Sequence, residues 1–316
     1  MDNHLPSDIA TQDKLLRGLN IIELEITPVC NLYCVHCYAE SSPLRRGDKS
    51  DIDWLQVLAD ARRLGATAVQ FIGGEPLLNR SLLSLISQAS SLGYGYIEVF
   101  SNLTTLTDNA VSHFQRYGVR VATSFYSRDE KIHEGITRMK GSYRKTIDGI
   151  TKILNAGLPL RASIVKTEAN RNDIENSVTF LRSMGVQEVR AGEVIAAGRG
   201  STLSLNKDLM AGLKGCGACW MGSLVVSWDG NVYPCLLSRS VLLGNIKSGS
   251  LNDILNAERL QQFRKEIYAT WLEKSLQSQG RKCGPDVGGC NPWDEPGCQP
   301  NCGVRVSSAA LKEIGP

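Results

Sequence analysis

Between residues 20 and 194, short apolar segments rich in β-forming residues alternate with longer amphipathic segments, and this alternation constrains the fold most. The apolar segments predict strands at residues 20–26, 68–72, 96–100, 119–125, 160–165 and 188–194. The amphipathic segments predict helices that include residues 54–64, 81–92, 143–155 and 173–184. Several of these end in a glycine, the usual left-handed helix stop: Gly65, Gly93, Gly157 and Gly185. The pattern predicts a parallel sheet with right-handed crossovers.

Six predicted strands are fewer than the eight of a closed βα barrel, so we expect an α/β fold with a curved, partly open (β/α)6 barrel. A flat doubly wound sheet is the alternative. The alternation stops near Gly198-Arg199-Gly200, and beyond it lie a predicted hairpin (residues 224–232), a helical stretch (251–271) and a tail rich in Gly, Pro and Cys. We expect an arm at 1–19, the barrel at 20–198, a linker at 199–215, a small cysteine-rich α+β domain at 216–306 and a tail at 307–316.

Composition excludes several partner classes. The chain is 42% hydrophobic and 21% charged, and its net charge of +3 is too small to argue for binding to nucleic acid or to a membrane surface. No apolar run approaches the ~20 residues of a membrane span. The first twenty residues lack the basic-then-apolar order of a signal peptide. We therefore expect a cytoplasmic protein.

The ten cysteines are grouped in two regions. Three lie within eight residues, at Cys30, Cys34 and Cys37, and the other seven lie between Cys216 and Cys302. Disulfides are rare in a reducing compartment, so clustered cysteines there indicate metal binding or catalysis. The grouping predicts two metal sites, and a disulfide framework is the alternative that the even count allows.

The first group, Cys30-Asn-Leu-Tyr-Cys34-Val-His-Cys37, directly follows the first predicted strand. Soft thiolates on one loop suit an iron–sulfur cluster, and three of them leave a fourth corner free for a substrate or cofactor. The loop also lies at the C-terminal end of a strand, where βα barrels place their chemistry. A zinc site with His36 as the fourth ligand is the alternative.

The C-x3-C-x2-C spacing, together with Asn31, Leu32 and Tyr38, resembles the signature of the radical S-adenosylmethionine (SAM) superfamily. The resemblance implies that the three cysteines hold a [4Fe–4S] cluster whose free iron chelates SAM. It implies reductive cleavage of SAM to a 5′-deoxyadenosyl radical, which abstracts a hydrogen atom from a substrate. It also places the His36 ring against the adenine.

Further positions resemble the SAM site of this family. Gly73-Gly74-Glu75-Pro76 follows the second strand and is similar to the GGEP motif: two glycines would let the backbone approach the ligand, and the glutamate would accept from the SAM ammonium. Ser101 and Asn102, after the third strand, resemble a ribose-contacting pair. Ser124 and Ser163, near the ends of the next two strands, are candidates of the same kind, with strand capping as the alternative.

The second group resembles the SPASM or "twitch" extension, which carries one or two auxiliary [4Fe–4S] clusters. The tail departs from that pattern, which leaves the ligand assignment open, and zinc knuckles are an alternative. The candidate ligands are Cys216, Cys219, Cys235, Cys283, Cys290, Cys298 and Cys302. We expect the basic residues of this region to form a solvated face: Arg239, Lys247, Arg264 and Lys265.

Enzymes with such extensions are similar to maturases of ribosomally made peptides, which introduce crosslinks, epimerise or oxidise. His133-Glu-Gly-Ile-Thr137 and the following Lys140-Gly-Ser-Tyr143 resemble a segment of those maturases, with an ordinary loop and helix N-cap as the alternative. Arg199 resembles a position that faces their active site, with a flexible linker arginine as the alternative. A peptide substrate, an electron donor such as flavodoxin or ferredoxin, and a separate peptide-recognition protein are the implied partners. A small-molecule tailoring enzyme or dehydrogenase and a non-enzymatic iron–sulfur or zinc protein are the alternatives. Nothing in the sequence distinguishes a general acid or base among Glu193, Asp129 and Tyr126.

Overall fold

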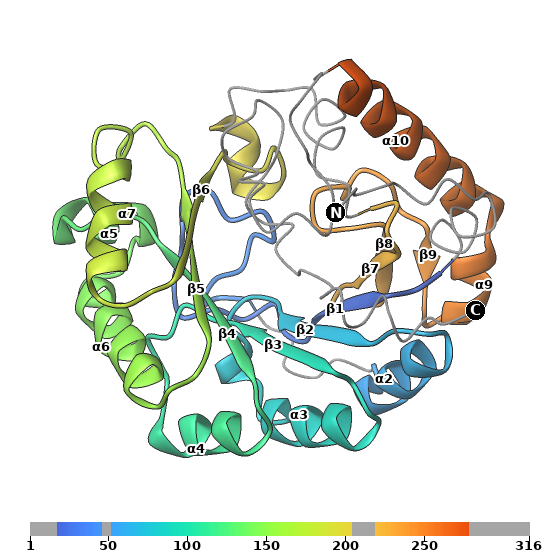
Figure 1. Cartoon of the computed structure of the whole chain (residues 1–316), viewed down its shortest axis with the longest axis horizontal. Helices are drawn as coiled ribbons and strands as arrows, with labels where there is room; N and C mark the ends of the chain where they lie inside the picture. The colour runs from blue at the N-terminus through green and yellow to red at the C-terminus, as the bar shows by residue number, and fades with distance from the viewer. Residues whose placement is uncertain (1–17, 46–51, 204–218, 278–316) are drawn as a thin grey trace, which may run out of the picture.

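The structure is a computed structural model that describes residues 18–45, 52–203 and 219–277. Within these residues the chain forms one curved sheet of nine strands, with helices along its outer side (Figure 1). The strand order is β6-β5-β4-β3-β2-β1-β7-β8-β9, so β6 and β9 form the two edges of the described sheet. The fold is therefore the predicted partial barrel rather than a flat doubly wound sheet.

All six predicted strands are present, and their ends lie within two residues of the predicted ones. Each of the first five pairs in parallel with the next strand along the chain, as short right-handed βα units require. The strands are β1 (Ile21–Glu25), β2 (Ala68–Ile72), β3 (Tyr96–Phe100), β4 (Arg120–Phe125), β5 (Leu160–Val165) and β6 (Glu188–Gly192).

The predicted helices of the barrel are also present, and the four glycines that follow them all have positive φ angles, as helix stops. Two further helices occur, α4 (Asp108–Arg116) and α5 (Glu130–Thr137), each capped by the side chain of the preceding Thr107 or Asp129. The other barrel helices are α2 (Trp54–Arg63), α3 (Leu82–Ser91), α6 (Ser142–Asn155) and α7 (Ile174–Ser183).

The two faces of the barrel strands differ in chemistry. On β1, Ile22 and Leu24 pack into the main hydrophobic core with residues of the outer helices. Glu23 and Glu25 alternate with them and therefore point to the inner face. Farther around the inner face, the buried Arg161 and Glu98 form an ion pair at 2.7 Å. The inner face of the barrel thus carries buried charged groups, two of which form an ion pair.

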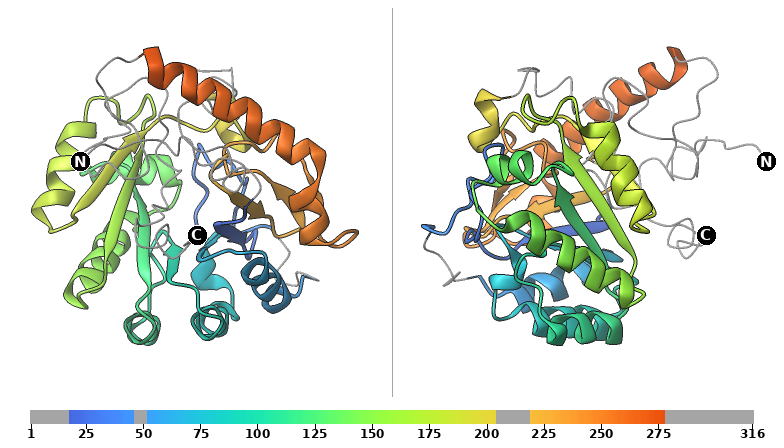
Figure 2. Two further views of the ribbon diagram at one scale, coloured as in Figure 1. Left: turned by 45° about the vertical axis from the view of Figure 1, so that its right-hand side comes forward. Right: turned by 90° about the vertical axis from the view of Figure 1, so that its left-hand side faces the viewer.

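The later part of the described chain extends the same sheet. β7 (Ser223–Val226) pairs in parallel with β1, and β8 (Asn231–Tyr233) and β9 (Gly244–Asn245) follow in antiparallel fashion. The predicted hairpin is therefore present, and it is joined to the barrel edge. The predicted helical stretch is divided at Ala257 into α9 (Leu251–Asn256) and α10 (Glu258–Gln277), and α10 runs over the β7–β8 hairpin (Figure 2).

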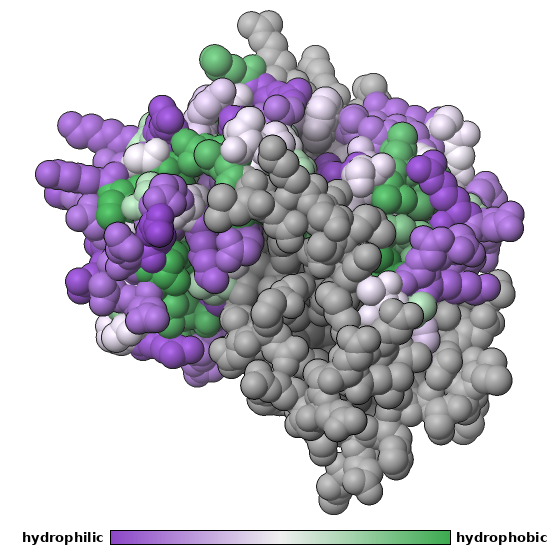
Figure 3. Space-filling view, turned by 90° about the horizontal axis from the view of Figure 1, so that it is seen from above, coloured by the Kyte–Doolittle hydropathy of each residue, from purple (hydrophilic) through white to green (hydrophobic). Residues whose placement is uncertain are grey.

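The described residues on the face shown in Figure 3 are mostly hydrophilic. On the face shown in Figure 3, groups of hydrophobic side chains are separated by hydrophilic ones. In the described ranges, no helix combines the length and the apolar character that crossing a membrane requires.

Candidate active site

The loop that carries Cys30, Cys34 and Cys37 leaves the C-terminal end of β1 and is fixed to the opposite part of the barrel. The N–H groups of Tyr33 and Val35 donate to the carbonyls of Thr137 and Ile136 at the end of α5, both at 3.0 Å. This contact requires α5 to be in place, which gives the His133–Thr137 segment a structural role beside the cysteine loop.

The three cysteines are buried or half-buried free thiols. Burial raises the pKa of the Cys30 and Cys34 thiols well above the ordinary value, so a bare thiolate is unfavourable at these positions. Two N–H groups point at the Cys30 sulfur, from Leu32 at 3.4 Å and from the Asn102 amide at 3.7 Å. Bound iron would supply the missing positive charge, so the donor set fits an iron–sulfur cluster. Within the described ranges, no three His, Cys, Asp or Glu side chains converge to hold a single metal ion.

Arg199 holds this loop from the other side. Its guanidinium donates to the carbonyls of Cys34 (2.9 Å) and Ser41 (2.8 Å) and lies 4.1 Å from the Tyr33 ring centroid. The flanking Gly198 permits the contact, because a Cβ there would lie 2.4 Å from the carbonyl oxygen of Tyr38. The resemblance placed Arg199 facing the active site, and in the structure its guanidinium is bound by the main chain of the cysteine loop.

The Gly73-Gly74 pair has a structural role beside the expected one. A Cβ on Gly73 would lie 2.5 Å from the Thr27 carbonyl oxygen, and a Cβ on Gly74 would lie 2.2 Å from that of Val29. Gly73 also has a φ of 136°, which strains any other residue. These glycines therefore let the end of β2 pack against the segment that leads into Cys30. A direct approach of their backbone to a ligand stays a prediction.

Glu75 is fully buried and largely engaged by the protein. One carboxylate oxygen accepts from the Ser101 hydroxyl (2.7 Å) and from the N–H of Leu77 (3.0 Å), and the other accepts from the N–H of Asn102 (2.8 Å). Burial raises the pKa of Glu75 to about 7, although these hydrogen bonds oppose the shift. A carboxylate has about four acceptor positions, so one remains on the second oxygen for an ammonium group. Pro76 follows at the start of a short 3-10 turn, Pro76–Leu78.

The other predicted SAM contacts include buried polar atoms that lack a protein partner. Ser163 Oγ is buried and, like Nδ1 of His36, has no hydrogen-bond partner among the described residues. Ser124 is opposite Ser163 in the β4–β5 register, so both belong to the inner face. Burial and the nearby Arg199 lower the pKa of His36 to about 4, which keeps its ring neutral near pH 7. Such unpartnered atoms favour a polar ligand in this part of the barrel.

The side chains of Ser101 and Asn102, the expected ribose-contacting pair, already form hydrogen bonds within the protein. The Ser101 hydroxyl donates to Glu75, and the Asn102 amide donates to the Asn31 side chain at 3.0 Å. Their contacts connect the β3 end to both the Glu75 turn and the cysteine loop. Ribose contact by either residue stays a prediction.

Two of the auxiliary cysteines lie within the described residues. The sulfurs of Cys219 and Cys235 are 2.8 Å apart and buried, and the Ser238 hydroxyl lies 3.4 Å from the Cys235 sulfur. The five other candidates lie outside the described residues: Cys216, Cys283, Cys290, Cys298 and Cys302. Two convergent thiols at the β7–β8 hairpin are consistent with a metal site there.

The expectation that the basic residues of this region form a solvated face is wrong for two of the four. Arg264 is fully buried and donates to the carbonyls of Gly18 (2.8 Å) and Ser223 (3.3 Å). Arg239 forms an ion pair with the buried Glu25 of β1 and lies 5.1 Å from the ring centroids of both Tyr38 and Tyr233. The sequence carries no signal for the ion pair of Arg239 and Glu25, because these two residues are more than 200 positions apart in the chain.

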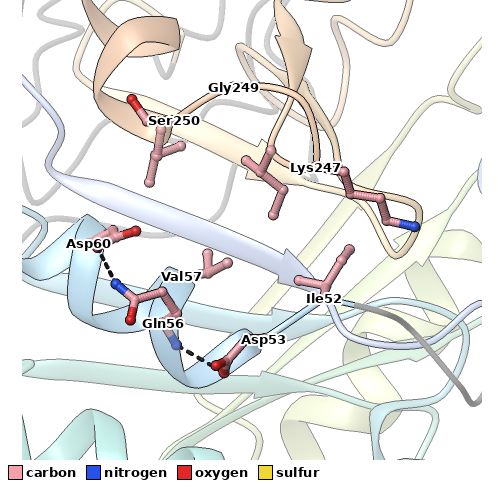
Figure 4. Close-up of a pocket in the computed structure, with 10 residues that line it drawn as sticks. Ile52, Asp53, Gln56, Val57, Asp60, Lys247, Gly249 and Ser250 are labelled. Carbon is pink, nitrogen blue, oxygen red and sulfur yellow. Dashed lines mark hydrogen bonds between the residues drawn. The ribbon is translucent and has the colours of Figure 1, made fainter.

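A groove on the outside of the barrel lies apart from these residues. It is formed between α2 and the turn that leads into α9 (Figure 4). Three of its polar side chains form hydrogen bonds within the helices. Asp53 caps α2, Gln56 donates to Asp60, and Ser250 belongs to the capping box of α9. We assign this groove to helix packing.

Family models match both halves of the chain. The model described as the radical SAM superfamily matches residues 24–181, and the model described as an iron–sulfur cluster-binding domain, SPASM, matches residues 216–284. The first contains the loop of Cys30, Cys34 and Cys37, and the second contains Cys219 and Cys235.

Among curated relatives, the chain is similar to the sporulation killing factor maturation protein SkfB of Bacillus subtilis strain 168. The two are 26% identical over 274 residues, which is 77% of this chain and 66% of the relative. It is also similar to a probable GTP 3′,8-cyclase of Methanopyrus kandleri, with 30% identity over 157 residues, 49% of this chain and 50% of the relative. The chain thus spans from half to just under two thirds of these two relatives.

Solved structures share the fold. Streptococcus suis SuiB bound to S-adenosylmethionine has a TM-score of 0.65 at 17% identity, over 81% of this chain and 70% of that one. The protein anSMEcpe, bound to AdoMet and a Cp18Cys peptide, has a TM-score of 0.61 at 17% identity, over 79% and 83% of the two chains. With a cysteine loop at the C-terminal end of β1 and a superfamily match across the barrel, this chain belongs to the radical SAM superfamily.

Proposed function

We propose that this protein is a radical SAM enzyme that modifies a ribosomally made peptide, by crosslinking, epimerisation or oxidation. The observation that carries the proposal is the loop of three thiols, which is held by Arg199, by the end of α5 and by the Gly73-Gly74 turn. A loop fixed on three sides can present three ligands to a cluster and leave its fourth iron accessible.

When bound and reduced, the cluster and SAM would supply a 5′-deoxyadenosyl radical that abstracts a hydrogen atom. Cys30, Cys34 and Cys37 would hold the cluster. The open acceptor position of Glu75 would bind the SAM ammonium, and neutral His36 would lie against the adenine. The unpartnered Ser163 hydroxyl and the neighbouring Ser124 would bind polar groups of SAM. Apolar packing beneath the loop, by residues such as Tyr126 and Ile136, would exclude water.

The peptide substrate is supported by the relatives. The named maturation protein SkfB matches 77% of this chain, whereas the named cyclase matches 49%. A precursor peptide, SuiA, is bound in a structure of SuiB, with a TM-score of 0.64. A reductant such as a ferredoxin or flavodoxin, one or two auxiliary [4Fe–4S] clusters and a separate recognition protein complete the proposal.

A small-molecule substrate is the second candidate, because the matches to probable GTP 3′,8-cyclases reach 30% identity. The experiment that separates the two starts from anaerobically reconstituted protein, reduced in the presence of SAM. It is incubated with peptides encoded beside the gene, or with GTP, and each reaction is followed by mass spectrometry. A mass change in a peptide supports the proposal. A product from GTP alone would replace it with the second candidate.

A further inference from the structure

Tyr126, the residue directly after β4, contacts the middle cysteine of the loop. Its hydroxyl oxygen lies 3.7 Å from the Cys34 sulfur, and its side chain is almost fully buried. Its ring meets the ring of His36 edge-on, with 5.0 Å between centroids. The sequence does not distinguish a general acid or base among Glu193, Asp129 and Tyr126. Of these three, Tyr126 is the residue that contacts the cysteine loop. Asp129 caps α5, and the exposed Glu193 pairs with Lys166.

The direction of this hydrogen bond follows from the chemistry of the ligand. A cysteine bound to iron is a thiolate, which has no proton to donate. The phenol is protonated near neutral pH and can donate its single proton. The Tyr126 hydroxyl is therefore the donor to the Cys34 sulfur.

The main chain around Tyr126 is held on several sides. The Tyr126 carbonyl accepts from the buried Asn170 amide at 2.7 Å, and the next residue, Ser127, donates to Asp173 at 2.5 Å. The ring packs against His133, with 5.2 Å between centroids. An apolar group of Ile136, Val165 and Val194 surrounds it. The low polarity of this packing strengthens a hydrogen bond to a charged sulfur.

We propose that Tyr126 is a positioning residue that raises the reduction potential of the SAM-binding cluster, by donating a hydrogen bond to the Cys34 thiolate. This inference rests on the proposed function. Reduction adds one electron from an external ferredoxin- or flavodoxin-type donor, and the added negative charge is shared by the cluster sulfurs. A donor to one of these sulfurs stabilises the reduced form more than the oxidised form. The residue thereby makes the cluster easier to reduce.

The test compares full-length, reconstituted wild-type protein with Tyr126→Phe, which removes only the hydroxyl. Reductive titrations are followed by electron paramagnetic resonance, and the signal altered by added SAM identifies the cluster with an open iron. We expect the Tyr126→Phe midpoint to move to a more negative potential with the iron content unchanged. The matched control is Tyr143→Phe, which removes a hydroxyl from the ring on the other side of His133 (5.6 Å between centroids) and should leave the midpoint in place.

Two further measurements keep the proposal falsifiable if Tyr126→Phe takes up less iron. Incorporation of 3,5-difluorotyrosine at position 126 gives a more acidic donor, and the midpoint should move to a less negative potential. In deuterated buffer, electron–nuclear double resonance should detect an exchangeable deuteron at the wild-type cluster that is absent from the cluster of Tyr126→Phe.

An unchanged midpoint in both variants, with normal iron content, would overturn the role of Tyr126 and leave the proposed function intact. Wild-type protein that binds no iron would overturn the proposed function itself.

Discussion

The SAM-site loop and the auxiliary region are fixed to the barrel in different ways. The loop of Cys30, Cys34 and Cys37 spans eight residues and is held by main-chain contacts from three parts of the scaffold. In the auxiliary region, Cys219 and Cys235 converge on the β7–β8 hairpin, while the other five cysteines are spread from Cys216 to Cys302. The described residues thus hold the first loop in place through the protein fold, whereas in the second region they bring only two thiols together.

Two alanine variants give the sharpest contrast between the regions. Cys34→Ala should abolish formation of 5′-deoxyadenosine, because it removes a ligand of the cluster that binds SAM. Cys235→Ala should retain part of the SAM cleavage and lose the modified product, because only the auxiliary site is damaged. Chromatography of the nucleoside and mass spectrometry of the substrate measure the two outcomes. Full turnover by either variant would contradict this division of roles.

The ion pair between Arg239 and Glu25 joins the two regions, and it should be costly to break. Arg239→Met leaves the buried Glu25 carboxylate without its cation, so the free energy of unfolding should fall by about 3–5 kcal/mol. The double variant Arg239→Met/Glu25→Gln should recover part of this loss. Urea unfolding measures both.

The matched control for this pair is Lys152→Met, which breaks an exposed ion pair with Asp108. Its effect should not exceed about 1 kcal/mol. If Arg239→Met is no more destabilising than Lys152→Met, the two regions are not joined through this contact.

The Gly74 contact tests how firmly the scaffold holds the first loop. Gly74→Ala places a Cβ against the Val29 carbonyl, so the segment before Cys30 must move. We expect a loss of about 1–3 kcal/mol in the free energy of unfolding and a lower iron content after reconstitution. Gly95→Ala is the control, because a Cβ there meets open space and the backbone has no positive φ. Equal iron uptake by both variants would mean that the loop tolerates displacement.

The smallest expected effect concerns Glu23, on the inner face beside the auxiliary cysteines. Burial raises the pKa of Glu23 from 4.5 to about 8, so the folded protein holds this proton more tightly than the unfolded chain. The contribution of Glu23 to the free energy of unfolding is therefore complete below pH 4.5 and declines up to about pH 8. The pKa values of His36 and His133 are both lowered to about 4. These two residues therefore increase the free energy of unfolding as the pH rises, but only between about pH 4 and 6.5.

Between pH 6.5 and 8, the free energy of unfolding of the metal-free protein should thus fall by about 1–2 kcal/mol. Glu23→Gln should flatten this decline, and parallel urea titrations of the two proteins would show it. The same slope in both proteins would remove Glu23 from the account.

The barrel could be predicted closely because its information is local. The period of the strands, the amphipathic helices and the stop glycines each lie within short segments, and all six strands were placed within two residues. The cysteine loop could also be recognised locally, because its three cysteines lie within eight residues and directly follow a strand. Long-range pairs gave no such signal: Glu25 meets Arg239, and Tyr126 meets Cys34, only because the sheet curves.

Some assignments from sequence had the right residues and incomplete reasons. The sequence predicts room for a ligand at Gly73-Gly74, and the structure adds that the two glycines leave room for the segment before Cys30. The sequence predicts that Arg239 and Arg264 are solvated, because it shows their charge. It does not show that Glu25 and the carbonyl of Gly18 lie inside the fold as their partners.

The central claim is that the loop of Cys30, Cys34 and Cys37 holds a cluster with one open iron, at which SAM is cleaved. The most direct test is the yield of 5′-deoxyadenosine from anaerobically reconstituted protein, reduced with dithionite in the presence of SAM. The account predicts that the wild type forms 5′-deoxyadenosine and that Cys34→Ala forms none. Wild-type protein that carries its full complement of iron and forms no 5′-deoxyadenosine would contradict it.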